Sequence, residues 1–238
     1  MNTIVALFKK EFKSYFVSPI AYVFIVVYLM ITNFLFFQGF FIMNQADMRS
    51  YFDILPWIFL FFIPAITMRS WAEERKNRTL ELLLTWPVSD VEVVVGKFLA
   101  SFCLLAVVIL LSLTVPITIA LLGKPDFGPI IGCYLGSFLM GGAYLAIGLW
   151  VSSLTENQIV AFIVGVVVTF LLFIIGVPFV TMVMPSFLVP LCNYLSLGNH
   201  FASIGRGVVD SRDIIYYLSV IGFFLFLNVR SFERRKWE

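Results

Sequence analysis

Six stretches of this 238-residue chain contain no Asp, Glu, Lys or Arg, and this pattern constrains the fold more than any other feature. A membrane-spanning helix needs about 20 mainly apolar residues. Of all residues, 61% are hydrophobic and 13% are charged, whereas soluble domains carry about 25% charged residues. A chain of this size cannot hide so much apolar surface from water in one core, so we expect an all-α polytopic membrane protein. The charge-free stretches are Ser14–Ala46, Ile54–Met68, Phe98–Gly123, Phe127–Thr155, Asn157–Gly205 and Ile214–Val229.

The stretches predict six spanning helices, and the basic residues predict their orientation. With six spans and both termini in the cytoplasm, 12 Lys and Arg residues fall inside and 4 fall outside, which is a positive-inside pattern. The fifth stretch has 49 residues and room for two spans, but a seventh span would put Arg234, Arg235 and Lys236 outside. We therefore expect one domain over residues 1–238, with spans at about 19–42, 50–69, 90–122, 129–153, 157–182 and 212–230.

Residues 183–211 must then lie outside the cytoplasm without crossing the membrane. Pro185, Pro190 and Gly198 interrupt this segment, as a re-entrant or interfacial structure requires. An ordinary apolar loop packed on the bundle is the alternative. The chain's single histidine, His200, lies here, and we interpret it as a local hydrogen-bonding residue rather than a ligand.

Sequence signals for helix starts fall at the expected boundaries. A serine followed by proline is typical of an N-cap and first helical residue, and Ser or Thr three residues before Glu or Gln is typical of a capping box. These signals are Ser18-Pro19, Ser89-x-x-Glu92 and Thr155-x-x-Gln158.

The sequence contains no evident catalytic or metal site. There is no HExxH or GxSxG motif, and Gly96-Lys97 and Gly123-Lys124 do not complete a phosphate-binding loop. No ionisable residue is expected deep within a span, where ion carriers usually need one. A net charge of +2 does not favour nucleic acid as a partner.

In the fourth span, Gly132-x-x-x-Gly136 permits close helix packing, which we expect within one bundle rather than at a subunit interface.

Residues 3–17 are typical of an amphipathic helix lying in the membrane plane. Leu7, Phe8 and Phe12 fall on one helical stripe, with Lys9 and Lys10 mostly opposite. Such a helix is either a basic anchor or an elbow helix beside a cytoplasmic partner.

The longest polar segment, at about 70–88, lies on the expected cytoplasmic side. A highly charged part is followed by Leu80, Leu83 and Leu84 on one helical side, and Pro87 ends the helix. An exposed leucine face is unfavourable unless the inner leaflet or a docked protein covers it.

The run AEERKNRTLELLLTWPVSDVEVVVGKFLA resembles the signature of type-2 ABC exporter permeases, the ABC-2 family. Within that family it is most similar to the permeases associated with gliding motility. The stretches LFKKEFKSYFVSPIAY and LSLGNHFASIGRGVVDSRDIIYY agree with this assignment, so the resemblance covers nearly the whole chain.

The resemblance implies a six-helix permease in a bacterial inner membrane, with an elbow helix, a coupling helix between spans 2 and 3, and a re-entrant external segment before span 6. It also implies a separate cytoplasmic ATPase that binds ATP and Mg²⁺, so this chain binds no cofactor and is not an enzyme. Further expected partners are an identical or related second permease subunit and membrane lipid, with room for a periplasmic accessory protein.

The turn at Glu156 is either a second ATPase contact or a plain connection. The resemblance implies ATPase coupling by Glu73, Glu74, Arg75, Thr79, Leu80, Glu81, Leu82, Leu83 and Pro87.

Two other functions remain open at this stage. One is a membrane anchor or mechanical subunit of a motility or secretion machine, without solute transport. The other is an ATPase-independent channel or secondary carrier, which the lack of charges within the spans disfavours.

Overall fold

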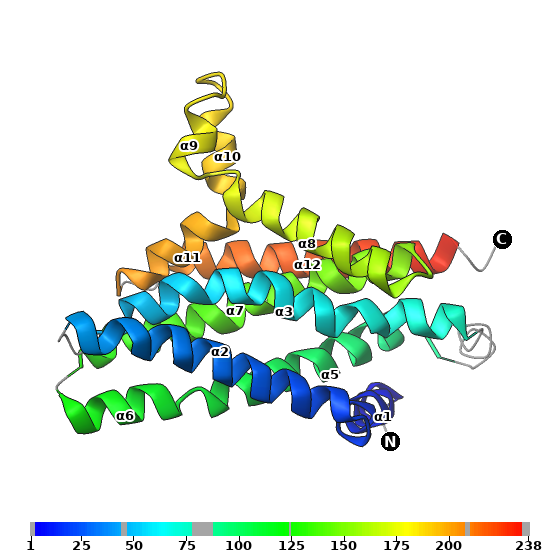
Figure 1. Cartoon of the computed structure of the whole chain (residues 1–238). Coiled ribbons are helices and arrows are strands. Elements are labelled where there is room, and N and C mark those ends of the chain that lie inside the picture. Colours follow the sequence, from blue (N-terminus) through cyan, green and yellow to red (C-terminus); the bar gives the residue numbers. More distant parts are fainter. Residues whose placement is uncertain (1–2, 44–46, 78–87, 124, 208–209, 235–238) are drawn as a thin grey trace.

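The computed structural model describes residues 3–43, 47–77, 88–123, 125–207 and 210–234, and Figure 1 gives the arrangement of their helices. These parts of the chain contain helices and short connections, without β-strands. The helices are α1 (Thr3–Val17), α2 (Pro19–Met43), α3 (Arg49–Lys76), α5 (Asp90–Leu111), α6 (Thr114–Leu122), α7 (Phe127–Leu154), α8 (Gln158–Ile174), α9 (Pro178–Thr181), α10 (Val189–Leu195), α11 (Leu197–Gly205) and α12 (Ser211–Arg234).

Five helical segments of the described chain are long and apolar enough to cross a membrane: α2, α3, α5 together with α6, α7, and α12. The expectation of an all-α membrane protein is therefore confirmed. A sixth apolar helix, α8, has 17 residues, which corresponds to about 26 Å and falls short of a typical hydrocarbon core of about 30 Å. The six-span count, which needs α8 to cross, stays a prediction. Both α1 and the last turns of α12 lie toward one end of the bundle (Figure 1).

Helix α7 forms the centre of the bundle because its small residues let neighbours approach closely. It packs against α3, α5, α8, α11 and α12. A Cβ at Gly136 would lie 3.2 Å from Ile204 of α11, and one at Gly148 would overlap the Thr67 side chain of α3. The glycines of this span therefore serve packing within the bundle, as expected.

The third span is broken between α5 and α6, and Pro116 explains the break. Proline has no backbone N–H, so the carbonyl of Ser112 loses its helical partner four residues later. That carbonyl instead accepts from the Val115 N–H at 3.0 Å and from the Tyr134 hydroxyl of α7 at 3.2 Å. A neighbouring helix thus satisfies the freed group, as a low-dielectric environment requires.

Two expected boundaries differ from the structure. Helix α3 continues to Lys76, so residues 70–76 extend a span rather than begin a loop. The fifth span was expected to reach residue 182, but α8 ends at Ile174. The chain turns there because Pro178 starts a new helix and Gly176 lies against Ser196, where a Cβ would be 2.5 Å from the serine Cβ.

The helix starts are mostly as expected. Ser89 and Glu92 form the complete capping box at α5, and α2 begins at Pro19. The capping box expected at Thr155 is wrong: the N-cap of α8 is Asn157, whose side chain accepts from the Ile159 N–H at 2.9 Å. Asparagine is as good an N-cap as threonine, and here it lies closer to the first helical turn.

The segment before the last span contains three short helices. Helices α9 and α10 project sideways from the bundle, whereas α11 returns along α7 (Figure 1). Gly207 follows α11 with φ +87°, a left-handed conformation that glycine adopts at little cost, and its N–H caps the Ile204 carbonyl at 3.0 Å. The broken character expected for this segment is present in the structure.

Candidate coupling site

Five helices and one turn meet at the end of the bundle that carries α1 and the last turns of α12. The centre of this meeting point is apolar. One buried cluster there contains Leu7, Trp71, Leu149 and Phe232. The Trp71 and Phe232 rings lie 5.1 Å apart. We call this region the inner junction: Leu7 and Glu11 of α1, Ser70–Arg75 of α3, Gly96 and Lys97 of α5, Ser152–Glu156 at the α7–α8 turn, and Phe232 of α12.

Lys97 joins three helices of the inner junction through a buried ion-pair network. Its ammonium lies 2.7 Å from the Glu74 carboxylate, 3.2 Å from that of Glu11 and 2.9 Å from the Ser70 carbonyl. The lysine side chain is only 4% exposed, and its ammonium also lies 4.9 Å from the Trp71 ring centroid. Loss of one member of a buried ion pair typically lowers the free energy of unfolding by about 3–5 kcal/mol, since the remaining charge stays buried.

Helix α1 is fixed to α5 by close packing. The Cβ of a residue at position 96 would lie 3.0 Å from the Leu7 Cβ, so Gly96 provides the space into which Leu7 packs. The Tyr15 hydroxyl lies 2.9 Å from the Ser101 hydroxyl, and burial raises the pKa of Tyr15, which keeps it a neutral hydrogen-bonding group. Helix α1 is therefore an integral part of the bundle's end.

Ser152 of α7 binds the backbone of α3 directly. Its hydroxyl accepts from the N–H groups of Trp71 and Ala72 at 3.2 and 3.3 Å and donates to the Met68 carbonyl at 3.1 Å. One side chain thus ties the last turns of α3 to the central helix.

The opposite end of the bundle contains a second polar cluster, which we call the outer junction: Tyr194–His200 together with Asp213, Tyr216 and Tyr217 of α12. His200 Nδ1 lies 2.6 Å from Asp213, and Nε2 lies 2.9 Å from the Tyr194 carbonyl, to which it donates. The imidazole stacks on Tyr216 with ring centroids 3.8 Å apart. The structure thus supports the interpretation of His200 as a hydrogen-bonding residue. A cavity of about 610 Å³ opens beside this cluster, with Asp53, Arg206 and Phe201 in its wall.

A family model described as "ABC-2 family transporter protein" matches residues 44–229 of the chain. The chain belongs to the ABC-2 transporter family. No curated protein matches the sequence significantly. The ABC-2 membrane domain is not itself catalytic, and membrane domains of this family work with a cytoplasmic ATPase in general.

In this ABC-2 chain, the residues predicted to contact an ATPase fall into two groups. Glu73, Glu74 and Arg75 occupy the last turns of α3, and Glu156 lies on the α7–α8 turn, 2.9 Å from the Arg75 guanidinium. Glu74 faces inward to Lys97, whereas Glu73 is half-exposed, 4.0 Å from Arg69. The other predicted residues lie outside the described residues: Thr79, Leu80, Glu81, Leu82, Leu83 and Pro87.

The predicted elbow residues all lie on α1, with the two faces expected. Leu7 is buried, and the rings of Phe8 and Phe12 stack at 5.6 Å. Lys9 and Lys10 are exposed. The amphipathic character expected of this segment is therefore present, while its role as an ABC-2 elbow helix stays a prediction.

Sequence reasoning missed the two residues that organise the inner junction, Lys97 and Ser152. Lys97 was counted among the cytoplasmic basic residues, lay in the family run and was rejected as a phosphate-loop lysine, but no structural partner was assigned to it, although a lysine two turns into an otherwise apolar helix needs one. Its partners Glu11 and Glu74 are 86 and 23 residues away in sequence, so only the fold identifies them. Ser152 gives no sequence signal that separates it from its neighbour Ser153.

Proposed function

We propose that this chain is the permease subunit of an ATP-driven ABC-2 exporter in a bacterial inner membrane, with both termini in the cytoplasm. A separate cytoplasmic ATPase binds ATP and Mg²⁺, and a second permease subunit, identical or related, completes the transport path. The excess of basic residues on the side of the termini, 12 against 4, supports this orientation.

The observation that carries the proposal is the inner junction. The segment that the family resemblance assigns to ATPase contact begins at the end of α3. That end is held by Lys97 to α1 and α5 and by Ser152 to α7. A displacement of the coupling segment therefore acts on several helices at once instead of bending one loop.

In the proposed mechanism, ATP binding closes the partner's nucleotide domains and moves the coupling segment between spans 2 and 3. A ligand shifts a conformational equilibrium only by its difference in affinity for the two states. The coupling segment supplies this difference by contacting the open and closed ATPase unequally, and the inner junction transmits the shift to α1, α5 and α7. The path then opens between the two permease subunits. The charge-free spans favour an amphipathic, lipidic or peptide-like cargo over a small ion.

The first test is a pull-down of the tagged chain from native membranes in a gentle detergent. Bound proteins are identified by mass spectrometry, and ATPase activity is assayed on the eluate. We expect an ATPase with the wild-type chain and with Lys13→Gln, an exposed residue of α1 outside the inner junction. We expect its loss with Glu81→Arg or Leu83→Asp, because these changes alter the charge and the apolar face of the predicted coupling helix. Recovery of no ATPase, where a control complex survives the same detergent, would contradict the permease proposal.

A second candidate function is a mechanical or anchoring role in a motility machine, in which ATP turnover remodels an assembly without moving a solute. The similarity of LFKKEFKSYFVSPIAY and of the coupling run to gliding-motility permeases favours it. Both candidates require the ATPase, so the pull-down does not separate them. Cargo movement into sealed vesicles that contain the purified complex does: ATP turnover without cargo movement favours the mechanical role.

A further inference from the structure

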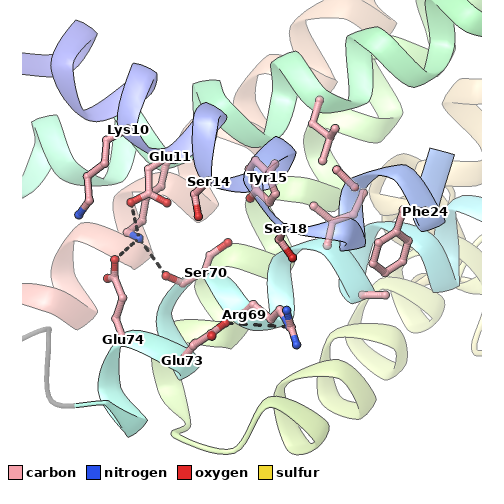
Figure 2. Close-up of a pocket in the computed structure, with 15 residues that line it drawn as sticks. Lys10, Glu11, Ser14, Tyr15, Ser18, Phe24, Arg69, Ser70, Glu73 and Glu74 are labelled. Atoms are coloured by element: carbon pink, nitrogen blue, oxygen red, sulfur yellow. Dashed lines mark hydrogen bonds and ion pairs between the residues drawn. The ribbon is translucent and has the colours of Figure 1, made fainter.

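Each end of the bundle holds a cavity, and the two cavities differ in how their charged residues are paired. The inner one, of about 290 Å³, lies between α1, α2, α3 and α5 (Figure 2). Its carboxylates already have cations, since Glu11 and Glu74 share Lys97. Glu73 lies 4.0 Å from Arg69. The cavity beside the outer junction, which we call the outer cavity, measures about 610 Å³, within the usual range for small-molecule sites, and its charges are not all paired.

The outer cavity has an apolar interior to which four helices contribute. The first two turns of α3 and of α7, the last turn of α8 and one face of α11 surround it. Phe52, Ile130 and Phe201, which are all buried, form part of its wall. An apolar group of a ligand would therefore leave water on entering the cavity, which favours binding.

Small residues of α11 leave room for the outer cavity. Gly198, Ala202 and Gly205 are spaced by four and three residues, so they share one helical face, and all three stand in the cavity wall. A Cβ at Gly198 would lie 3.0 Å from the Phe173 carbonyl oxygen, so this glycine is also required for packing against α8. Ala202 is exposed, and a large side chain at this position would occupy part of the cavity.

Five charged residues stand in the wall of the outer cavity, and two of them are unpaired. Asp47 lies 3.6 Å from Arg49, and Asp126 caps α7 by accepting from a first-turn backbone N–H at 3.1 Å. The side chains of Asp53, on α3, and Arg206, directly after α11, form no ion pair or hydrogen bond within the part of the chain that the structure describes. The wall thus offers one carboxylate and one guanidinium, on different elements, beside an apolar interior.

We propose that the outer cavity binds a short apolar peptide in its zwitterionic form. A peptide of two or three residues carries an ammonium, a carboxylate and apolar side chains, and its extended length is about 7–10 Å. The ammonium binds Asp53, and the carboxylate binds Arg206, whose guanidinium has the paired donors that carboxylates prefer. The apolar side chains pack against Phe52 and Phe201. A zwitterionic phospholipid offers the same two charges, but its long acyl chains do not fit inside a cavity of this size.

The experiment is isothermal titration calorimetry of the purified full-length chain in detergent, without any ATPase, so it is independent of the proposed ATPase partner. Leucyl-phenylalanine carries both charges, its N-acetyl form lacks the ammonium, and its C-terminal amide lacks the carboxylate. We expect each blocked peptide to bind about tenfold more weakly than the free peptide, because each loses one contact between charged groups. Dihexanoyl-phosphatidylethanolamine, the lipid probe, should bind more weakly than the free peptide.

Variants assign each charge of the peptide to a residue. Asp53→Asn should weaken the free peptide about tenfold and remove its advantage over the N-acetyl form. Arg206→Gln should do the same with respect to the amide. Ala202→Trp should weaken all probes, because it fills the cavity. All three side chains are exposed, so the variants should fold, which size-exclusion chromatography checks. Arg212→Gln, at an exposed arginine outside the cavity wall, is the matched control and should bind as the wild type does.

Four results would overturn the proposal. No binding of the free peptide, or equal affinity for the free and blocked peptides, would show that the two charges do not recognise a zwitterion. Peptide binding that is unchanged in Asp53→Asn and Arg206→Gln, or in Ala202→Trp, would place the peptide elsewhere on the chain. Binding of the lipid probe as tight as that of the peptide would make the cavity a phospholipid site. None of these results bears on whether an ATPase binds the chain.

Discussion

The two ends of the bundle are held by different chemistry. At the inner junction, Lys97 joins groups 86 and 23 residues distant in sequence, and Arg75 contacts Glu156 across 81 residues. At the outer junction, His200 bonds to Asp213 and to Tyr194, 13 and 6 residues away. The inner contacts therefore reach from α1 to α5 and from α3 to the α7–α8 turn, whereas the outer contacts join segments at most 23 residues apart, such as Ser196 and the Phe173 carbonyl.

This difference indicates how each end responds to force. Polar contacts between distant helices oppose their relative displacement, so we expect the inner junction to move as a unit. The outer junction ties α11 to α12 but is joined to α7 mainly by apolar packing of Phe201 and Ile204 against Gly136. Apolar packing is non-directional and permits small shifts at lower cost than ion pairs do. The proposed permease, driven by an ATPase at the end that carries the termini, needs this combination.

Lys97→Met should have the largest effect, because it leaves two mostly buried carboxylates, 19% and 20% exposed, without their shared cation. We expect the free energy of unfolding to fall by about 3–5 kcal/mol, measured by detergent denaturation in mixed micelles. Glu11→Gln and Glu74→Gln combined with Lys97→Met should recover much of this loss, because no buried charge then remains. A Lys97→Met chain as stable as the wild type would show that the inner junction is not held by its ion pairs.

Gly96→Val should detach α1 from α5 without changing any charge. Its Cβ alone would lie 3.0 Å from that of Leu7, and overpacking of this kind typically costs about 1–3 kcal/mol. Gly222→Val is the matched control, since no heavy atom lies within 4 Å of its added Cβ. Faster hydrogen exchange confined to α1 in Gly96→Val would confirm the expected local separation. Equal behaviour of the two glycine variants would contradict it.

Asp213→Asn tests the outer junction and should act more locally. It weakens the 2.6 Å contact with His200, and we expect a loss of about 1–2 kcal/mol. Hydrogen exchange should rise in α11 while the inner junction keeps wild-type protection. If exchange also rises in α1 and at the end of α3, the two ends are coupled more tightly than their contacts indicate.

The sequence predicted the parts of this fold that depend on local composition. Charge-free stretches located the helices, the capping box at Ser89 located the start of α5, and the helical stripe of residues 3–17 located α1. Each of these signals is complete within a few turns of chain. The end of α8 at Ile174 was missed because Gly176 is required by a contact with Ser196, which is distant in sequence.

The candidate site was predictable only where it coincides with the family signature. Glu73, Glu74 and Arg75 belong to a recognisable run, yet nothing in that run indicates that Glu74 faces inward. Its orientation is decided by Lys97, whose burial depends on the packing of α1 against α5. Contacts of this kind follow from tertiary structure and carry no sequence pattern of their own.

The Arg75–Glu156 pair should contribute least to stability and gives the sharpest test of what the inner junction does. The two side chains are 17% and 67% exposed, and exposed ion pairs are typically worth about 0–1 kcal/mol. In a double-mutant cycle with Arg75→Gln and Glu156→Gln, we expect a coupling energy within that range. ATPase recovery in the pull-down should nevertheless fall for Glu156→Gln if the α7–α8 turn is a second docking contact. Unchanged ATPase recovery would mean that the α7–α8 turn is a plain connection. A coupling energy well above 1 kcal/mol would mean that the Arg75–Glu156 pair belongs to the buried ion-pair network around Lys97.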